Sequence, residues 1–156
     1  MHVHDNTQTH FMGEVTRQDG KIFRYCKAHG TLTAKTPYKI LADSSGWLTA
    51  AIADAASNTV GCAYGLSGCK IGIPEAAVGS GKYGWLQVGG KVSDAILTSC
   101  TATVNYCVGW VAATCIKTGA AFSGQREVFA IFTATAAATT THDILMLNRE
   151  VGCDST

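Results

Sequence analysis

Serine and histidine side chains are the first candidates for chemistry in this sequence. A catalytic serine needs a base beside it and a third group that orients the base. Ser67 and Ser80 lie in glycine-rich segments, but neither has the G-x-S-x-G spacing of a nucleophile elbow. His29 and His142 both fall in turn-like positions. We therefore predict that the serines serve turns, that the chain has no catalytic residues and that it is not an enzyme.

The first residues of the chain carry a pattern that could bind a metal. His2 and His4 could ligate a transition metal through two imidazoles, with Asp5 and His10 completing the set. Ordering such a polar segment around a metal costs conformational entropy. A solvated arm is the favoured interpretation, and no metal ligands are expected.

A phosphate loop and a carboxylate pair are also poorly supported. The segment 79–82, Gly-Ser-Gly-Lys, lacks the first glycine of a phosphate-binding loop and the Ser or Thr that should follow the lysine. A strand is expected after it, so the helix terminus that binds anions is missing. The eleven acidic residues are scattered along the chain. We expect no cofactor and no general acid–base pair.

Cysteine is abundant, and its odd count excludes complete internal pairing. The polar start of the chain predicts no signal peptide and therefore synthesis in a reducing compartment. Most of the thiols are expected to be free and buried or half-buried, while a disulfide framework or a metal site is the alternative. Two pairs share a C-x6-C spacing, which is longer than zinc sites favour. The seven cysteines are Cys26, Cys62, Cys69, Cys100, Cys107, Cys115 and Cys153.

Three tryptophans could form a ligand platform or anchor a subunit contact. These are Trp47, Trp85 and Trp110. Filling the core or a subunit contact is the favoured interpretation. A platform of exposed Trp and Tyr rings would instead be typical of a carbohydrate-binding β-module.

Composition narrows the class of protein. A chain of 156 residues is the usual size of one domain, and its net charge of +1 argues against a nucleic-acid partner. No apolar run approaches the ~20 residues of a membrane helix. Only 15% of the residues are charged, although 47% are apolar. A surface so poor in charge suggests self-association.

The elements that must position these residues are expected to be short strands, because turn residues recur along the chain and proline is rare. Asp19-Gly20 predicts a hairpin turn immediately before the first of them, 21–28. Residues 48–56 could form one or two helical turns, and 133–141 could be a loop or a flat strand. The predicted strands are 21–28, 38–42, 70–73, 82–88, 92–97, 101–111, 127–133 and 143–148.

Side-chain alternation indicates which residues share a face of these strands. In 82–88, Tyr83, Trp85 and Gln87 are expected on one face, opposite Gly84, Leu86 and Val88. In 101–108, the shared face is expected to carry Ala102, Val104, Tyr106 and Val108. About eight short strands with at most one short helix predict a β-barrel or a β-sandwich.

An amino-terminal arm, residues 1–13, is expected to precede a single β domain, residues 14–156. The arm is polar, and its only sizeable apolar side chains are Val3, Phe11 and Met12. Ordering costs about 1–2 kcal/mol per residue, so the free protein is expected to have a mobile arm. Strand addition to a partner could order it in an assembly.

Residues 71–90, IGIPEAAVGSGKYGWLQVGG, resemble a pattern found in small structural proteins of tailed bacteriophages. Residues 25–34, YCKAHGTLTA, and residues 100–108 are similar to flanking segments of that family, and the likeness extends loosely over 15–151. The resemblance implies a capsid decoration (cement) protein, made in the host cytoplasm, that binds the outside of the head as a homotrimer on the major capsid protein. A head-fibre base or a tail component is the alternative within this class.

Overall fold

The computed structural model describes residues 7–42, 48–51, 70–111, 114–115 and 128–148. These residues form strands and connecting turns without any helix, which confirms the mainly-β prediction. The structure has more strands than the eight predicted. They are β1 (Val15–Gln18), β2 (Lys21–Ala28), β3 (Tyr38–Ala42), β4 (Leu48–Ala51), β5 (Lys70–Pro74), β6 (Tyr83–Ala102), β7 (Cys107–Val111), β8 (Thr114–Cys115), β9 (Val128–Phe132) and β10 (Ala136–Leu147).

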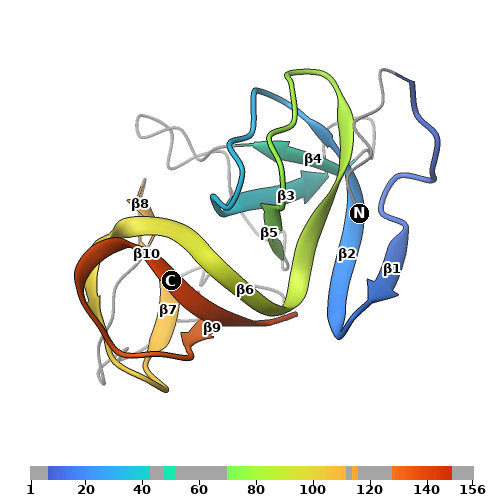
Figure 1. The fold of residues 1–156 in the computed structure, drawn as a ribbon. Helices are drawn as coiled ribbons and strands as arrows, with labels where there is room; N and C mark the ends of the chain where they lie inside the picture. Colours follow the sequence, from blue (N-terminus) through green and yellow to red (C-terminus); the bar gives the residue numbers. More distant parts are fainter. Residues whose placement is uncertain (1–6, 43–47, 52–69, 112–113, 116–127, 149–156) are drawn as a thin grey trace, which may run out of the picture.

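One sheet contains all ten strands, in the order β1-β2-β4-β3-β5-β6-β10-β9-β7-β8. The sheet as a whole is not closed into a barrel. An additional pairing of β2 with β6 folds its first part back on itself, so that β2, β4, β3, β5 and β6 form a ring of paired strands. The long strand β6 continues from this ring to β10, and it joins the two parts of the molecule (Figure 1).

A tight hairpin joins β1 and β2 where Asp19-Gly20 predicts it. Both central residues have positive φ, 51° for Asp19 and 73° for Gly20, as a type I′ turn requires. Gln18 and Lys21 face each other across this turn. The hairpin therefore fixes the register of β1, the first edge of the sheet.

The predicted strands 82–88 and 92–97 are one continuous strand, β6, which contains an irregular segment at Gly89–Gly90. Gly90 has a φ of 88°, and a Cβ placed there would lie 2.5 Å from the carbonyl oxygen of Gly20. The buried Gln87 side chain donates two hydrogen bonds of 3.0 Å, to the carbonyls of Gly89 and Lys91. Glycine and glutamine thus let β6 pass the hairpin tip without leaving polar groups unpaired.

Three clusters of buried side chains stabilise the sheet. Alternation along β6 separates two of them as predicted: Leu86 and Val88 belong to the cluster of the ring, whereas Trp85 belongs to an aromatic cluster on the other face. The third cluster lies between β5, β6, β7, β9 and β10. The aromatic cluster consists of Phe23, Tyr25 and Trp85, with Met12 and Tyr83 packed against it.

The predicted helical turns over 48–56 are wrong for the described part of that segment. Leu48–Ala51 forms β4, which pairs antiparallel with β3 and parallel with β2. These pairings complete the ring, so the sheet overrides the helical preference of the alanines. The remainder, 52–56, lies outside the described residues.

The prediction of a single strand over 101–111 is also wrong. β6 ends at Ala102, and a turn over Thr103–Tyr106 leads into β7, with Asn105 at a φ of 67°. Val104 and Tyr106 are 43% and 39% exposed, so they do not share the buried face of Ala102 and Val108. Asparagine tolerates positive φ, and this turn signal outweighs the apolar alternation.

The low-complexity segment 133–141 is partly strand, because β10 begins at Ala136. Its pairing with β6 is irregular, with register shifts between Ala136 and Thr139 and between Thr139 and Thr141. Small side chains specify register weakly, which is the reason for these shifts.

Candidate functional site

The described part of the arm, residues 7–13, lies on the aromatic cluster of β2 and β6. The His10 ring contacts two aromatic rings edge-on, at centroid distances of 5.1 Å from Tyr25 and 5.0 Å from Trp85. Tyr25 is fully buried and Trp85 is 4% exposed. His10 therefore attaches the arm to the sheet. The apolar residues of the arm gave no sign of this contact in the sequence.

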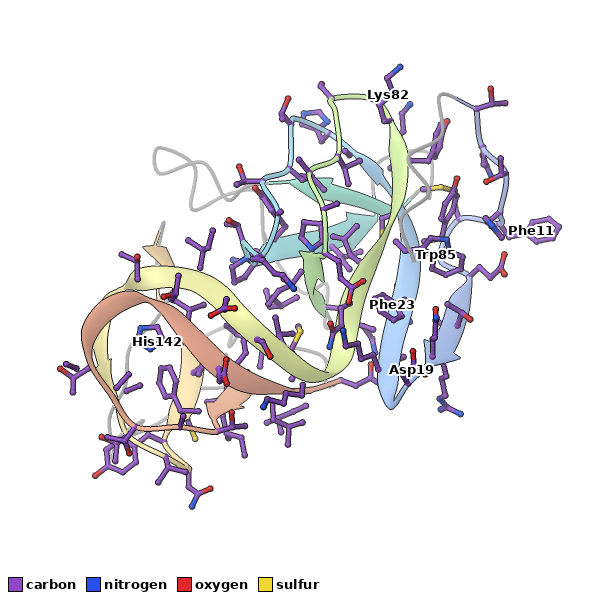
Figure 2. All side chains as sticks on the ribbon, in the orientation of Figure 1. Phe11, Asp19, Phe23, Lys82, Trp85 and His142 are labelled. Atoms are coloured by element: carbon purple, nitrogen blue, oxygen red, sulfur yellow. The ribbon has the colours of Figure 1, made fainter. Side chains whose placement is uncertain are left out.

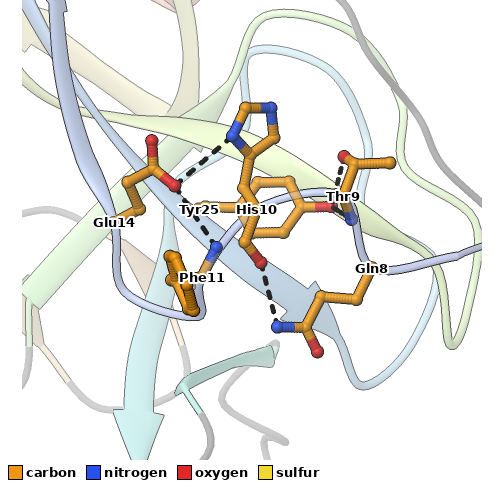
Figure 3. A network of polar contacts seen from close by, with 6 residues as sticks. All are labelled: Gln8, Thr9, His10, Phe11, Glu14 and Tyr25. Atoms are coloured by element: carbon orange, nitrogen blue, oxygen red, sulfur yellow. Dashed lines mark hydrogen bonds and ion pairs between the residues drawn. The ribbon is translucent and has the colours of Figure 1, made fainter.

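A network of polar contacts reinforces this attachment (Figure 3). The hydroxyl of Tyr25 lies 3.3 Å from both the main-chain nitrogen and Oγ1 of Thr9. Oε2 of Glu14 accepts a hydrogen bond from the N–H of Phe11 at 3.2 Å and lies 3.3 Å from Nδ1 of His10. Gln8 Nε2 donates to the carbonyl of His10 at 2.9 Å. The side chains of Gln8 and Glu14 thus form hydrogen bonds to the main chain of the residues between them.

A turn then leads the chain into β1. Glu14 N–H donates to the carbonyl of Phe11 at 2.9 Å, and Gly13 has a φ of 80°, as expected at the third position of a type II turn. Tyr25 exchanges hydrogen bonds of 2.9 Å with two residues, accepting from Gly13 and donating to Glu14. Two residues opposite one form a β-bulge with its glycine in the left-handed region.

Phe11 begins this turn, and its side chain is 83% exposed. It points away from the sheet, whereas the labelled Trp85 lies inward beneath the arm (Figure 2). Its main chain is bonded on both sides, through the N–H to Glu14 and through the carbonyl to the turn. A large aromatic side chain on an ordered turn is the kind of residue that anchors a protein–protein contact.

Trp85 fills the core, so the favoured interpretation is confirmed for this tryptophan. The neighbouring Tyr83 stacks on Tyr25, with a centroid distance of 6.1 Å and an interplanar angle of 10°. Lys27 Nζ lies 5.8 Å from the centroid of the Tyr83 ring. Nε1 of Trp85 is buried without a hydrogen-bond partner. Trp47 and the side chain of Trp110 lie outside the described residues.

The glycine-rich segment 79–82 forms a turn between β5 and β6. Lys82 N–H donates to Gly79 at 3.1 Å, and Gly81 N–H donates to Ala28 at 2.9 Å. Ser80 Oγ donates to the main-chain carbonyl of His29 at 3.4 Å, so this contact is not a nucleophile–base pair. A strand follows the turn, as predicted.

The remaining candidates for chemistry are dispersed or lie outside the described residues. The predicted turn position of His142 is wrong, because the residue is buried in strand β10, with its ring 5.2 Å from that of Phe132. Within the described ranges, no group of three or more His, Cys, Asp or Glu side chains could hold a metal ion. His10 contacts Glu14 and two aromatic rings, whereas His2, His4 and Asp5 are not described, and neither is Ser67.

Two cysteines have described side chains, and both thiols are free. Cys26 is buried in β2, and Cys107 is half-buried in β7. Both agree with the prediction of free, buried or half-buried thiols. Cys62, Cys69 and Cys153 lie outside the described residues, as do the side chains of Cys100 and Cys115.

Cys26 is expected to stay unreactive at alkaline pH. Desolvation by burial raises the pKa of its thiol from 9.0 to about 12, despite the opposing charge of Arg24. At pH 9 its thiolate fraction should be on the order of one in a thousand. Site-resolved alkylation followed by mass spectrometry should find Cys26 protected relative to Cys107. Equal rates would contradict the burial of Cys26.

The same raised pKa predicts a loss of stability in alkali. The fold favours the neutral thiol, so this stabilisation is fully present below pH 9 and is lost as the pH rises toward 12. Cys26→Ala should therefore have a flatter dependence of unfolding free energy on pH above 9. An unchanged slope in that window would show that Cys26 ionises freely in the fold.

No helix in the described ranges is long and apolar enough to cross a membrane. No protein-family model, curated protein or solved structure matches the chain.

Proposed function

We propose that the protein is a structural virion protein, a capsid decoration protein that binds the outer surface of a phage head and stabilises it. The observation that carries the proposal is the exposed Phe11 on an ordered turn, because this side chain is available to bind the surface of a partner. The resemblance of residues 71–90 to small structural phage proteins indicates that the particle to which it binds is a phage virion. The proposed partners are the major capsid protein and further copies of this chain in a homotrimer, without nucleic acid or membrane.

Residues of the resembling segment have architectural roles, which supports a structural protein. β5 and β6 pair directly, with Ile73 opposite Gln87 and Pro74 opposite Leu86. Trp85 contacts His10 of the arm, and Gln87 donates hydrogen bonds to the main-chain carbonyls on both sides of Gly90. The residues of this segment thus stabilise the fold, and the proposed contact with the capsid is made by the arm.

A carbohydrate-binding module receives less support. Such a module needs exposed aromatic rings gathered on one face. Trp85 is 4% exposed and covered by His10, and the exposed rings of Phe11 and Tyr106 belong to separate turns. Placement on a tail or a fibre base would use the same arm, and separate binding assays on heads and tails distinguish these particles.

Co-sedimentation tests the proposal directly. Purified protein should pellet saturably with DNA-free heads of the phage that encodes it, and sedimentation velocity should report a trimer in solution. Binding to purified tails but not to heads would move the protein to the tail. Binding to neither particle, together with specific signals on a glycan array, would overturn the proposal in favour of the carbohydrate-binding class.

Phe11→Ala is expected to weaken attachment to heads by about tenfold to a hundredfold, as truncation of an aromatic anchor does. The thermal midpoint should not change, because the side chain is 83% exposed. Val104→Ala is the matched control, since Val104 is an exposed apolar residue in a turn at another end of the sheet. Equal binding by both variants would show that Phe11 is not the anchor.

A further inference from the structure

Strand β1 is an edge strand of the sheet that the described residues form, a feature that the function proposed above does not use. It is the first strand in the sheet order and pairs with β2, while its other side carries no described strand (Figure 1). Four residues, Val15–Gln18, make up this edge. An uncovered edge presents main-chain donors and acceptors to any extended segment that comes beside it.

The register defines which main-chain groups face outward. Gln18 and Lys21 flank the two-residue turn, and Tyr25 N–H donates to Glu14 at the other end of the hairpin. In antiparallel pairs, hydrogen-bonded and non-hydrogen-bonded positions alternate. Gln18 and Thr16 therefore bond to β2, and the N–H and C=O groups of Val15 and Arg17 point away from it. These four groups match the bonding pattern of one added strand.

One face of this edge carries a basic and an apolar side chain. Arg17 and Val15 are two residues apart on β1 and thus share a face, and Arg24 is the cross-strand partner of Val15. In the part of the chain that the structure describes, neither arginine has an ion-pair partner. Nε of Arg24 is buried without a hydrogen-bond partner, and Val15 is 48% exposed. The positive charge of this face is therefore uncompensated.

We propose that the β1 edge binds an extended, acidic segment of a partner protein as an added strand. Main-chain hydrogen bonds to Val15 and Arg17 provide the pairing, and carboxylates of the added strand contact Arg17 in the field of Arg24. An apolar side chain of the same segment covers Val15. The proposal concerns the edge alone and holds whichever particle carries the partner.

Charge distinguishes this occupant from a second copy of the chain. Pairing of β1 with another β1 would bring two further arginines to the face that already carries Arg17 and Arg24. Like charges on neighbouring strands are destabilising. An acidic strand meets the same face with the opposite charge, so the edge favours a different partner over itself.

The test uses the full chain labelled with ¹⁵N and two short synthetic peptides, one alternating valine with glutamate and one alternating valine with lysine. The glutamate peptide should shift the amides of Val15–Gln18 saturably, with the Val15 and Arg17 amides gaining protection from hydrogen exchange. Its affinity should exceed that of the lysine peptide by about tenfold at low salt and should fall as salt is added. Absence of shifts at millimolar peptide, or equal affinity for the two peptides, would overturn the proposal.

Variants separate the edge from general charge effects. Arg17→Glu should lower the affinity for the glutamate peptide by about tenfold and raise the affinity for the lysine peptide, since the charge pairing is reversed. Lys82→Glu is the matched control for a reversed charge, because Lys82 lies at the turn before β6, at the opposite end of the β2–β6 pair from Asp19 (Figure 2). Val15→Pro removes one outward N–H at a position where an edge strand tolerates proline. It should therefore lower the affinity for the glutamate peptide. Concentration-dependent shifts at Val15–Gln18 without peptide would assign the edge to a second copy instead.

Discussion

Trp85→Ala is expected to lower the free energy of unfolding by about 3–5 kcal/mol, the usual cost of truncating a buried tryptophan. The side chain is 4% exposed, and it packs with Phe23 and Tyr25 beneath the ring of His10. Its removal opens a cavity in the aromatic cluster and also deprives the arm of one of its two ring contacts. Urea denaturation followed by circular dichroism measures the loss.

The arm gives this variant a second readout. Amides in the turn after His10, including Gly13 and Glu14, should exchange faster in Trp85→Ala than in the parent protein, because their segment has lost part of its support. Phe11→Ala is the control, since truncation of an exposed side chain is expected to change stability by less than about 0.5 kcal/mol. A Trp85→Ala protein with unchanged stability and a dissociated oligomer would place Trp85 in a subunit contact.

Gly90→Ala is expected to lower the free energy of unfolding by roughly 2–5 kcal/mol. A φ of 88° places an L-residue in a region that costs about 1–2 kcal/mol. The added Cβ would also lie 2.5 Å from the Gly20 oxygen and 3.0 Å from Cα of Lys21, and such overpacking costs about 1–3 kcal/mol more. Both neighbours are main-chain atoms, so the hairpin itself must move. Thermal and urea unfolding measure the loss.

Gly81→Ala separates the two contributions to this loss. Gly81 has a φ of 73°, but a Cβ placed there would have no atom within 4 Å. The control should therefore lose only the conformational part, about 1–2 kcal/mol. If Gly90→Ala costs no more than Gly81→Ala, the close crossing of β6 over the β1–β2 hairpin is wrong.

Local signals predicted several elements of this fold correctly. The Asp19-Gly20 turn depends on the φ preferences of two adjacent residues, so the hairpin and the start of β2 could be deduced from the chain alone. The bounds predicted for 21–28 and 38–42 agree with β2 and β3. The alternation around Trp85 likewise follows from strand geometry, which places Leu86 and Trp85 in different clusters.

Partners distant in sequence decided the other elements. Leu48–Ala51 is a strand because β2 and β3 lie on its two sides, and four residues rich in alanine carry no local sign of that pairing. The predicted strands 82–88 and 92–97 are one strand, β6, in which Gly90 makes room for the hairpin tip, about seventy residues away along the chain.

The sequence by itself determined that the described chain is mainly β and that a turn occupies the glycine-rich segment 79–82, because these properties depend on composition and on local backbone preferences. Only the tertiary structure decided what the arm does. From the sequence, His10 is a candidate metal ligand or a solvated residue, since Tyr25 and Trp85 are distant from it along the chain. Tyr25 and Trp85 come from β2 and β6, and the pairing of those two strands places their side chains together beneath His10, leaving Phe11 exposed.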